Sequence, residues 1–135
     1  MSDHPPVGRC ILIVDDSVEY LNFMQLLLEA EGFRSGVVTS AAAMQEWLRT
    51  STPDMIISDV CIPGESSFSV LDVLQADQRT SAIPLLLCTG AVQEVERQAE
   101  RLQRSGVEIL LKPFDIEVLI DKVVRLCATQ SVPQL

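Results

Sequence analysis

The sequence predicts a doubly wound α/β domain, in which helices cover both faces of a five-stranded parallel sheet. Strand-like apolar runs alternate five times with amphipathic stretches, as they do in domains of this class. Polar residues follow four of these runs directly, where the carboxyl ends of parallel strands would share one crevice. With 135 residues, 47% of them apolar and 21% charged, the chain is long and apolar enough to bury the core of one domain.

The expected strands are short apolar runs. Four of the five strands contain the runs Ile11–Val14, Met55–Ser58, Leu85–Cys88 and Ile109–Leu111, one run in each strand. The expected strands cover residues 9–14, 33–38, 54–58, 84–88 and 107–111, and the expected helices cover residues 18–31, 40–50, 67–77, 92–105 and 115–127.

Residues at the ends of the helical segments support these boundaries. Ser17, Ser40 and Asp115 stand where the N-caps of the first, second and last helices are expected. Gly32 and Gly106 follow the first and fourth helices, where glycine commonly ends a helix.

The apolar stripes predict how firmly the last two helices pack. The last helix has a broad stripe, made of Ile116, Leu119, Ile120, Val123, Val124 and Cys127. The fourth has a narrow one, made of Val92, Val95, Ala99 and Leu102, and we expect it to be held loosely.

The first helix carries more apolar residues than one buried face needs. They are Tyr20, Leu21, Phe23, Met24, Leu26, Leu27 and Leu28. Such a helix is either sandwiched deep in the protein or presents an exposed apolar face to a partner.

Charge and cysteine content exclude several classes of function. A net charge of −9 argues against direct binding of nucleic acid, which requires a basic surface. The four cysteines form no CxxC pair, so we expect reduced thiols in the core, with Cys61 exposed in a loop. No apolar stretch approaches the ~20 residues that span a bilayer, and the first residues do not resemble a signal peptide. We therefore expect a cytoplasmic domain over residues 9–127, with no membrane contact and flexible tails at 1–8 and 128–135.

The polar residues at the strand ends suggest a site for a divalent cation and a phosphoryl group. Asp15, Asp16 and Asp59 would bring three carboxylates to the crevice, together with the hydroxyl of Thr89 and the ammonium of Lys112. Two carboxylates about 5 Å apart repel by ~3 kcal/mol at an effective dielectric of 20, so such a cluster needs a cation or a retained proton. Mg²⁺ prefers oxygen ligands and often bridges carboxylate and phosphate.

These motifs resemble the receiver domain of two-component response regulators. The similarity rests on Asp15-Asp16, on Asp59 with Pro63, on Thr89-Gly90 and on Lys112-Pro113-Phe114, and it extends from about Cys10 to Cys127. The resemblance implies a flavodoxin-like (β/α)5 fold with strand order 2-1-3-4-5.

The resemblance also implies a role for each residue of the site. Asp59 would be the nucleophile that accepts a phosphoryl group, a known form of covalent catalysis. Asp16 and Asp59 would ligate Mg²⁺ directly, Asp15 would ligate it through water, and the Cys61 backbone carbonyl would be a further ligand. Lys112, on a cis peptide bond to Pro113, would pair first with a carboxylate and then with the phosphoryl group, which Thr89 would sense.

The partners implied are a sensor histidine kinase or histidine phosphotransfer protein and a downstream protein target or output domain. The first helix would contact the phosphodonor protein, and the fourth helix, fifth strand and fifth helix would offer a homodimer face. The family commonly has an aromatic residue near Ile109, where this chain has only aliphatic ones, so we expect incomplete coupling between Thr89 and the fifth strand.

Two alternatives stay open. A degenerate receiver would act as an interaction module without phosphorylation. A haloacid-dehalogenase-like phosphatase also uses an aspartate nucleophile with Mg²⁺, but it needs a second aspartate two residues on, where this chain has Ser17 after Asp15 and Val18 after Asp16. In a receiver, the only chemistry would be self-phosphorylation and dephosphorylation, so we expect a signalling protein and not an enzyme.

Overall fold

The computed structural model describes residues 8–130 and has a parallel sheet of five strands in the order β2-β1-β3-β4-β5. The predicted fold class and strand order are confirmed. The strands are β1 (Cys10–Val14), β2 (Arg34–Val38), β3 (Met55–Ser58), β4 (Leu85–Thr89) and β5 (Glu108–Leu111). The helices are α1 (Val18–Ala30), α2 (Ala41–Trp47), α3 (Ser69–Gln75), α4 (Gln78–Ser81), α5 (Val92–Arg97), α6 (Ala99–Ser105) and α7 (Ile116–Gln130).

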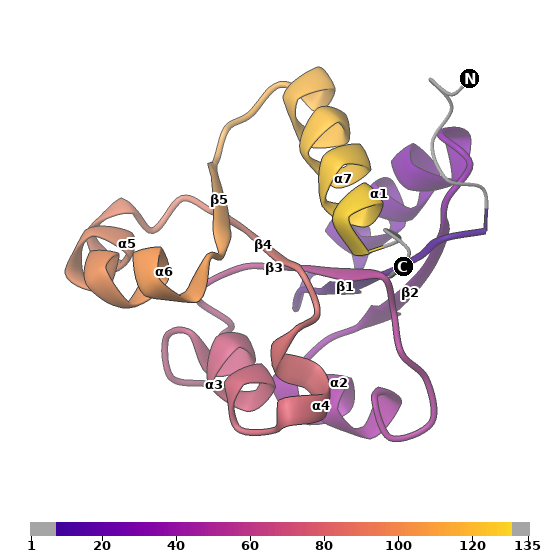
Figure 1. Ribbon diagram of the computed structural model, residues 1–135. Coiled ribbons are helices and arrows are strands. Elements are labelled where there is room, and N and C mark those ends of the chain that lie inside the picture. The colour runs from indigo at the N-terminus through magenta and orange to yellow at the C-terminus, as the bar shows by residue number, and fades with distance from the viewer. Residues whose placement is uncertain (1–7, 131–135) are drawn as a thin grey trace.

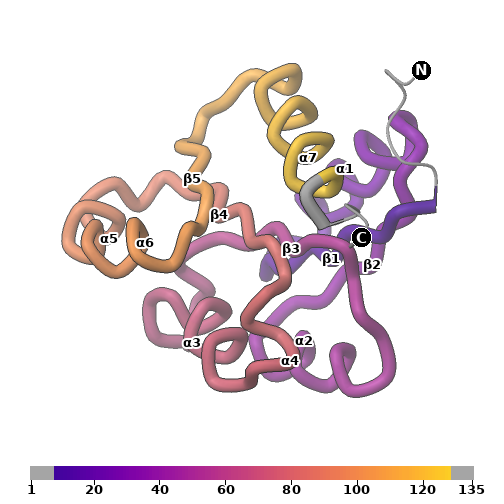
Figure 2. Tube along the Cα trace, viewed as in Figure 1, coloured from indigo at the N-terminus to yellow at the C-terminus, as the bar shows by residue number. Residues whose placement is uncertain are grey.

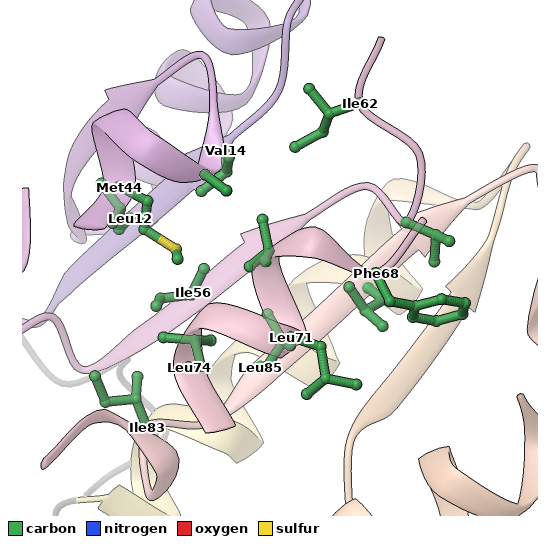
Figure 3. Packing of buried hydrophobic residues seen from close by; sticks show 14 of the residues in the cluster. Leu12, Val14, Met44, Ile56, Ile62, Phe68, Leu71, Leu74, Ile83 and Leu85 are labelled. Carbon is green, nitrogen blue, oxygen red and sulfur yellow. The ribbon is translucent and has the colours of Figure 1, made fainter. Parts of the chain in front are cut away.

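Helices cover both faces of the sheet (Figure 1). Helices α1 and α7 lie on one face, and α2, α3 and α4 lie on the other. Strand residues alternate between the faces, because successive side chains of a strand point in opposite directions. Ile11 and Ile13 pack with α1 and α7, whereas Leu12 and Val14 join the opposite cluster, shown in Figure 3.

The predicted caps of α1, α2 and α6 are present. The Ser17 hydroxyl accepts a hydrogen bond from the Tyr20 N–H, and the Ser40 hydroxyl accepts one from the Ala43 N–H. Gly106 ends α6 in the left-handed region at φ 71°, which glycine adopts without strain.

The third and fourth predicted helices differ from the observed ones. The helix predicted over residues 67–77 begins at Ser69, because Phe68 has a left-handed backbone at φ 64°. A further short helix, α4, follows it and is capped by Asp77. The helix predicted over residues 92–105 is divided at Gln98, whose φ of −108° and ψ of 20° are not helical.

The divided helix is also the one predicted to be held loosely. Segment α5 contains no buried residue, and in α6 only Leu102 is buried. In the tube of Figure 2, α5 and α6 lie beside β5, and Arg101 of α6 forms hydrogen bonds with Asp72 and Gln75 of α3. A segment with so few buried apolar contacts opens at little free-energy cost.

The first helix is not sandwiched. Leu21, Met24 and Leu28 are buried, but Phe23 is 46% exposed and Leu26 is 70% exposed. The buried-helix alternative is therefore wrong, and a docking role for the exposed residues stays a prediction.

The chain ends fall mostly outside the described residues. Residues 1–7 and 131–135 of the predicted tails are not described, while α7 continues to Gln130, inside the segment 128–135. Between residues 8 and 130, every helix is too short or too polar to cross a membrane.

Candidate functional site

The site residues lie at the carboxyl edge of the sheet. Strand β1 lies between β2 and β3. The connection after β1 therefore leads to the strand on one side of it, and the connection after β2 leads to the strand on its other side. A crevice forms outside the strand ends at such a switch point. Asp15 directly follows β1, Asp59 follows β3, and Lys112 follows β5, while Thr89 is the last residue of β4 and not the first after it.

Asp59 and Lys112 are joined in an ion pair. The Lys112 Nζ lies 3.2 Å from Oδ2 of Asp59, and the Cys61 N–H donates to Oδ1 at 3.1 Å. Each carboxylate oxygen thus has a donor, which fixes the orientation of the group. The Asp59 side chain remains 20% exposed, so a molecule from solvent can reach it.

Asp15 is a buried carboxylate. It is 6% exposed, and its Oδ1 accepts a hydrogen bond of 2.9 Å from the Ser17 N–H. Burial raises the pKa of Asp15 above its ordinary value, and the negative charges of Asp16 and Asp59 act in the same direction, against the hydrogen bond and the Lys112 charge. Keeping this group ionised therefore costs free energy that a bound cation would offset.

Asp16 is exposed, in contrast to its neighbour. Within residues 8–130, no three His, Cys, Asp or Glu side chains come together closely enough to enclose a metal ion. Such a cage is not what Mg²⁺ requires, because this ion keeps several waters and usually takes only one or two carboxylates. Asp15 offers one buried carboxylate, on which the negative charges of Asp16 and Asp59 act. Carboxylate oxygens of this kind are compatible with such an ion.

Thr89 connects the ends of β4 and β5. It is 1% exposed, and its Oγ1 accepts a hydrogen bond of 3.0 Å from the Ala91 N–H. Its main-chain carbonyl accepts a hydrogen bond of 2.8 Å from the Lys112 N–H. The hydroxyl thus holds the start of the loop that leads to α5.

The peptide bond between Lys112 and Pro113 is cis, as the resemblance implied.

The cysteines differ in exposure. Cys61 is exposed, as predicted, and its Sγ lies 3.8 Å from the Ser67 Oγ. Cys88 and Cys127 are buried and free, whereas Cys10 is only partly buried.

Glu65 anchors the loop that follows Asp59, a role that the sequence did not reveal. Its Oε2 accepts a hydrogen bond from the Ala41 N–H at the start of α2, and its Oε1 accepts one from the Ser69 hydroxyl. One carboxylate therefore accepts hydrogen bonds at the N-termini of both α2 and α3, where a negative charge is favourable. A single glutamate in a turn gives no sequence signal for such a contact.

Tyr20 is a second residue whose place was not foreseen. The Lys112 ammonium lies 4.5 Å from the centroid of its ring. Burial raises the pKa of the Tyr20 phenol well above its ordinary value, and the Cys88, Asp15 and Asp59 groups add to this shift, so the phenol keeps its proton. In the sequence Tyr20 was only one member of an oversized apolar set.

Comparison with known proteins shows that the chain is similar to regulatory proteins of a known family. The family model described as "Response regulator receiver domain" matches residues 11–124. The DNA-binding dual master transcriptional regulator RpaA of Synechocystis is 30% identical over 92% of this chain. The transcriptional regulatory protein GltR of Pseudomonas aeruginosa is 29% identical over 95% of it. The chain spans 52% of the length of each of these two relatives.

Two solved structures have the same fold. The receiver domain of a signal transduction histidine kinase from Syntrophus aciditrophicus has a TM-score of 0.81 at 26% identity, with 94% of this chain and 96% of that one covered. A sensor protein from Polaromonas has a TM-score of 0.80 at 27% identity, with 91% and 98% covered.

Proposed function

Because this chain belongs to the family of response regulator receiver domains, we propose that it accepts a phosphoryl group on Asp59 and then changes its contacts with protein partners. The family assignment makes the chain a receiver domain of two-component signalling, and no finding supports a phosphatase. The observation that carries the proposal is Asp59 itself, held between the Cys61 N–H and the Lys112 ammonium at a solvent-accessible crevice.

The transfer is a displacement at phosphorus. A carboxylate oxygen of Asp59 forms a bond to phosphorus as the bond to the donor breaks, and the electron pair of that bond leaves with the donor group. That group is an imidazole nitrogen of a phosphohistidine or the acyl oxygen of a small acyl phosphate. The product is an acyl phosphate on Asp59.

The surrounding residues act by charge and position. The Lys112 ammonium compensates negative charge on the phosphoryl oxygens once they replace its present partner oxygen. The Thr89 hydroxyl can donate to one of these oxygens, which takes it away from the Ala91 N–H. Asp15, Asp16, Asp59 and the Cys61 backbone carbonyl would hold Mg²⁺, which when bound offsets charge on the transferring group.

The proposed phosphodonor is a sensor histidine kinase or histidine phosphotransfer protein. Exposed Phe23 and Leu26 on α1 give such a protein an apolar surface close in sequence to the acidic pair Asp15 and Asp16. Exposed Val92, Leu111 and Val118 support the predicted homodimer face on the α5–β5–α7 side.

The absence of direct nucleic-acid binding stays a prediction from the net charge of −9. One relative is a DNA-binding regulator, but this chain spans only about half of it. A downstream protein target or an output domain is the proposed recipient of the signal.

The proposal is tested by the mass of the intact protein after incubation with acetyl phosphate and Mg²⁺. Wild type should gain one phosphoryl group that hydroxylamine removes, and Asp59→Asn should gain none. Asp121→Asn, which alters an exposed aspartate on α7, is the matched control and should behave as wild type. Normal phosphorylation of Asp59→Asn would place the nucleophile elsewhere.

A further inference from the structure

The aromatic ring of Tyr20 lies against the ammonium that pairs with Asp59. The Lys112 Nζ is 4.5 Å from the ring centroid and 3.2 Å from Oδ2 of Asp59, so one cation contacts both groups. A cation within about 6 Å of an aromatic face is attracted by the negative charge of that face.

The tyrosine is itself fixed at the edge of the site. Tyr20 lies in the first turn of α1, and its N–H donates to the Ser17 hydroxyl that caps the helix. The same short segment supplies Asp15, whose carboxylate accepts from the Ser17 N–H. The ring position is thus set by the backbone that also positions the acidic pair.

The ring, and not the hydroxyl, is the part of Tyr20 that makes a contact of note. The hydroxyl oxygen is buried, and none of the residues between 8 and 130 forms a hydrogen bond with it. A buried hydroxyl without a partner lowers stability and gives no reason for a tyrosine at this position. The ring contact with Lys112 does give such a reason.

A lysine side chain is long and flexible, and fixing it costs conformational entropy. We propose that Tyr20 is a positioning residue, whose ring holds the Lys112 ammonium beside Asp59 so that it meets the incoming phosphoryl oxygens. This inference rests on the proposed function, because it assigns Lys112 to the phosphoryl transfer.

The kinetic test uses acetyl phosphate at a fixed concentration with Mg²⁺. Tyr20→Leu should slow phosphorylation about fivefold, which corresponds to ~1 kcal/mol of transition-state stabilisation. Tyr20→Phe keeps the ring and should restore most of the rate. Leu27→Ala, which removes packing about two turns further along the same helix, should leave the rate unchanged.

A double-mutant cycle separates positioning from general support of the fold. In a Lys112→Ala background, Tyr20→Leu should cause no further loss of rate, because its effect passes through the ammonium. An equal fivefold loss in both backgrounds, or a Tyr20→Leu rate equal to wild type, would overturn the proposal.

Nuclear magnetic resonance tests the ring contact without any phosphodonor. The sequence contains two lysines, Lys112 and Lys122, so the second is an internal reference. The side-chain protons of Lys112 should be shifted upfield by the ring in wild type and in Tyr20→Phe, and those of Lys122 should not. Absence of this shift in wild type would overturn the proposal even if Tyr20→Leu failed to fold.

The two hypotheses fail in different ways. A wild type that shows the ring-current shift but takes up no phosphoryl group would refute the proposed function and, with it, the role of Tyr20 in transfer. A wild type that is phosphorylated but lacks the shift would refute only the role of Tyr20.

Discussion

The ammonium of Lys112 lies 3.2 Å from a carboxylate oxygen of Asp59, although the two residues are 53 positions apart in the sequence. The pair joins the loop after β3 to the loop after β5, across the end of β4. It places a fixed positive charge beside the proposed nucleophile, where negative charge would arrive with the phosphoryl group.

Asp15→Asn should increase the free energy of unfolding in the absence of divalent cations, by about 1 kcal/mol. The substitution removes a buried charge and its repulsion with Asp16 and Asp59, while the amide oxygen can still accept from the Ser17 N–H. Urea denaturation with and without Mg²⁺ measures the effect.

Asp16→Asn is the matched control, because Asp16 is exposed and should gain less stability without metal. Both variants should bind Mg²⁺ at least about tenfold more weakly, or ~1.4 kcal/mol, so their advantage over wild type should shrink as Mg²⁺ is added. An Asp15→Asn protein no more stable than wild type without metal would contradict the cost assigned to this carboxylate.

Beryllofluoride, a phosphoryl mimic, should change hydrogen exchange mainly between Gly90 and Gly106. The Thr89 hydroxyl would turn from the Ala91 N–H to the mimic, and the weakly anchored α5 and α6 would respond. Mass spectrometry of exchanged peptides measures the change.

Thr89→Ala should raise exchange in this segment before any addition and abolish most of the response, whereas Thr89→Ser keeps a hydroxyl and should respond. Because position 109 is isoleucine and not an aromatic residue, we expect hydrogen exchange to change less in β5 than in α5 and α6. A response confined to α1, or one that survives in Thr89→Ala, would show that the signal leaves by another path.

The stabilising contribution of Glu108 should be lost when the protein is acidified. Hydrogen bonds from Arg125 and Lys122 lower the pKa of Glu108 below its ordinary value of 4.5. The Glu108 carboxylate therefore binds a proton more readily in the unfolded chain than in the folded one. Its stabilisation of the folded state is complete above about pH 4.5 and is lost as pH falls through the folded-state pKa.

Glu108→Gln should lack this part of the acid-induced loss, which is below about 1 kcal/mol because the groups are partly exposed. Thermal unfolding followed between pH 3 and 7 would measure it, with Glu117→Gln as a control for an exposed carboxyl on α7. Identical pH dependence in Glu108→Gln and wild type would show that the ion pairs contribute nothing.

Much of the fold could be predicted because buried parallel strands have a clear signature. Runs such as Ile11–Val14 are apolar without interruption, and their polar successors mark where the strands end. The helix over residues 92–105 was predicted as continuous because its apolar spacing is helical, but its few buried contacts do not prevent the break at Gln98.

The site was predictable only as far as the strand ends determine it. Sequence motifs brought Asp59 and Lys112 together correctly, because parallel strands end at one edge. The contacts of Glu65 and Tyr20 were not predictable, since each depends on where a side chain from another segment lies. The difference in burial between the adjacent Asp15 and Asp16 also arises from the backbone path and not from residue type.

Chemical trapping can identify directly the residue that carries the phosphoryl group, which we propose to be Asp59. After incubation with acetyl phosphate and Mg²⁺, borohydride reduces an aspartyl phosphate to homoserine, and peptide mass spectrometry locates the altered residue. Homoserine should appear at position 59 only when the phosphodonor is present, and positions 15 and 16 should be unchanged. Homoserine at another position, or a phosphorylated protein with position 59 unaltered, would show that Asp59 is not the residue that accepts the phosphoryl group.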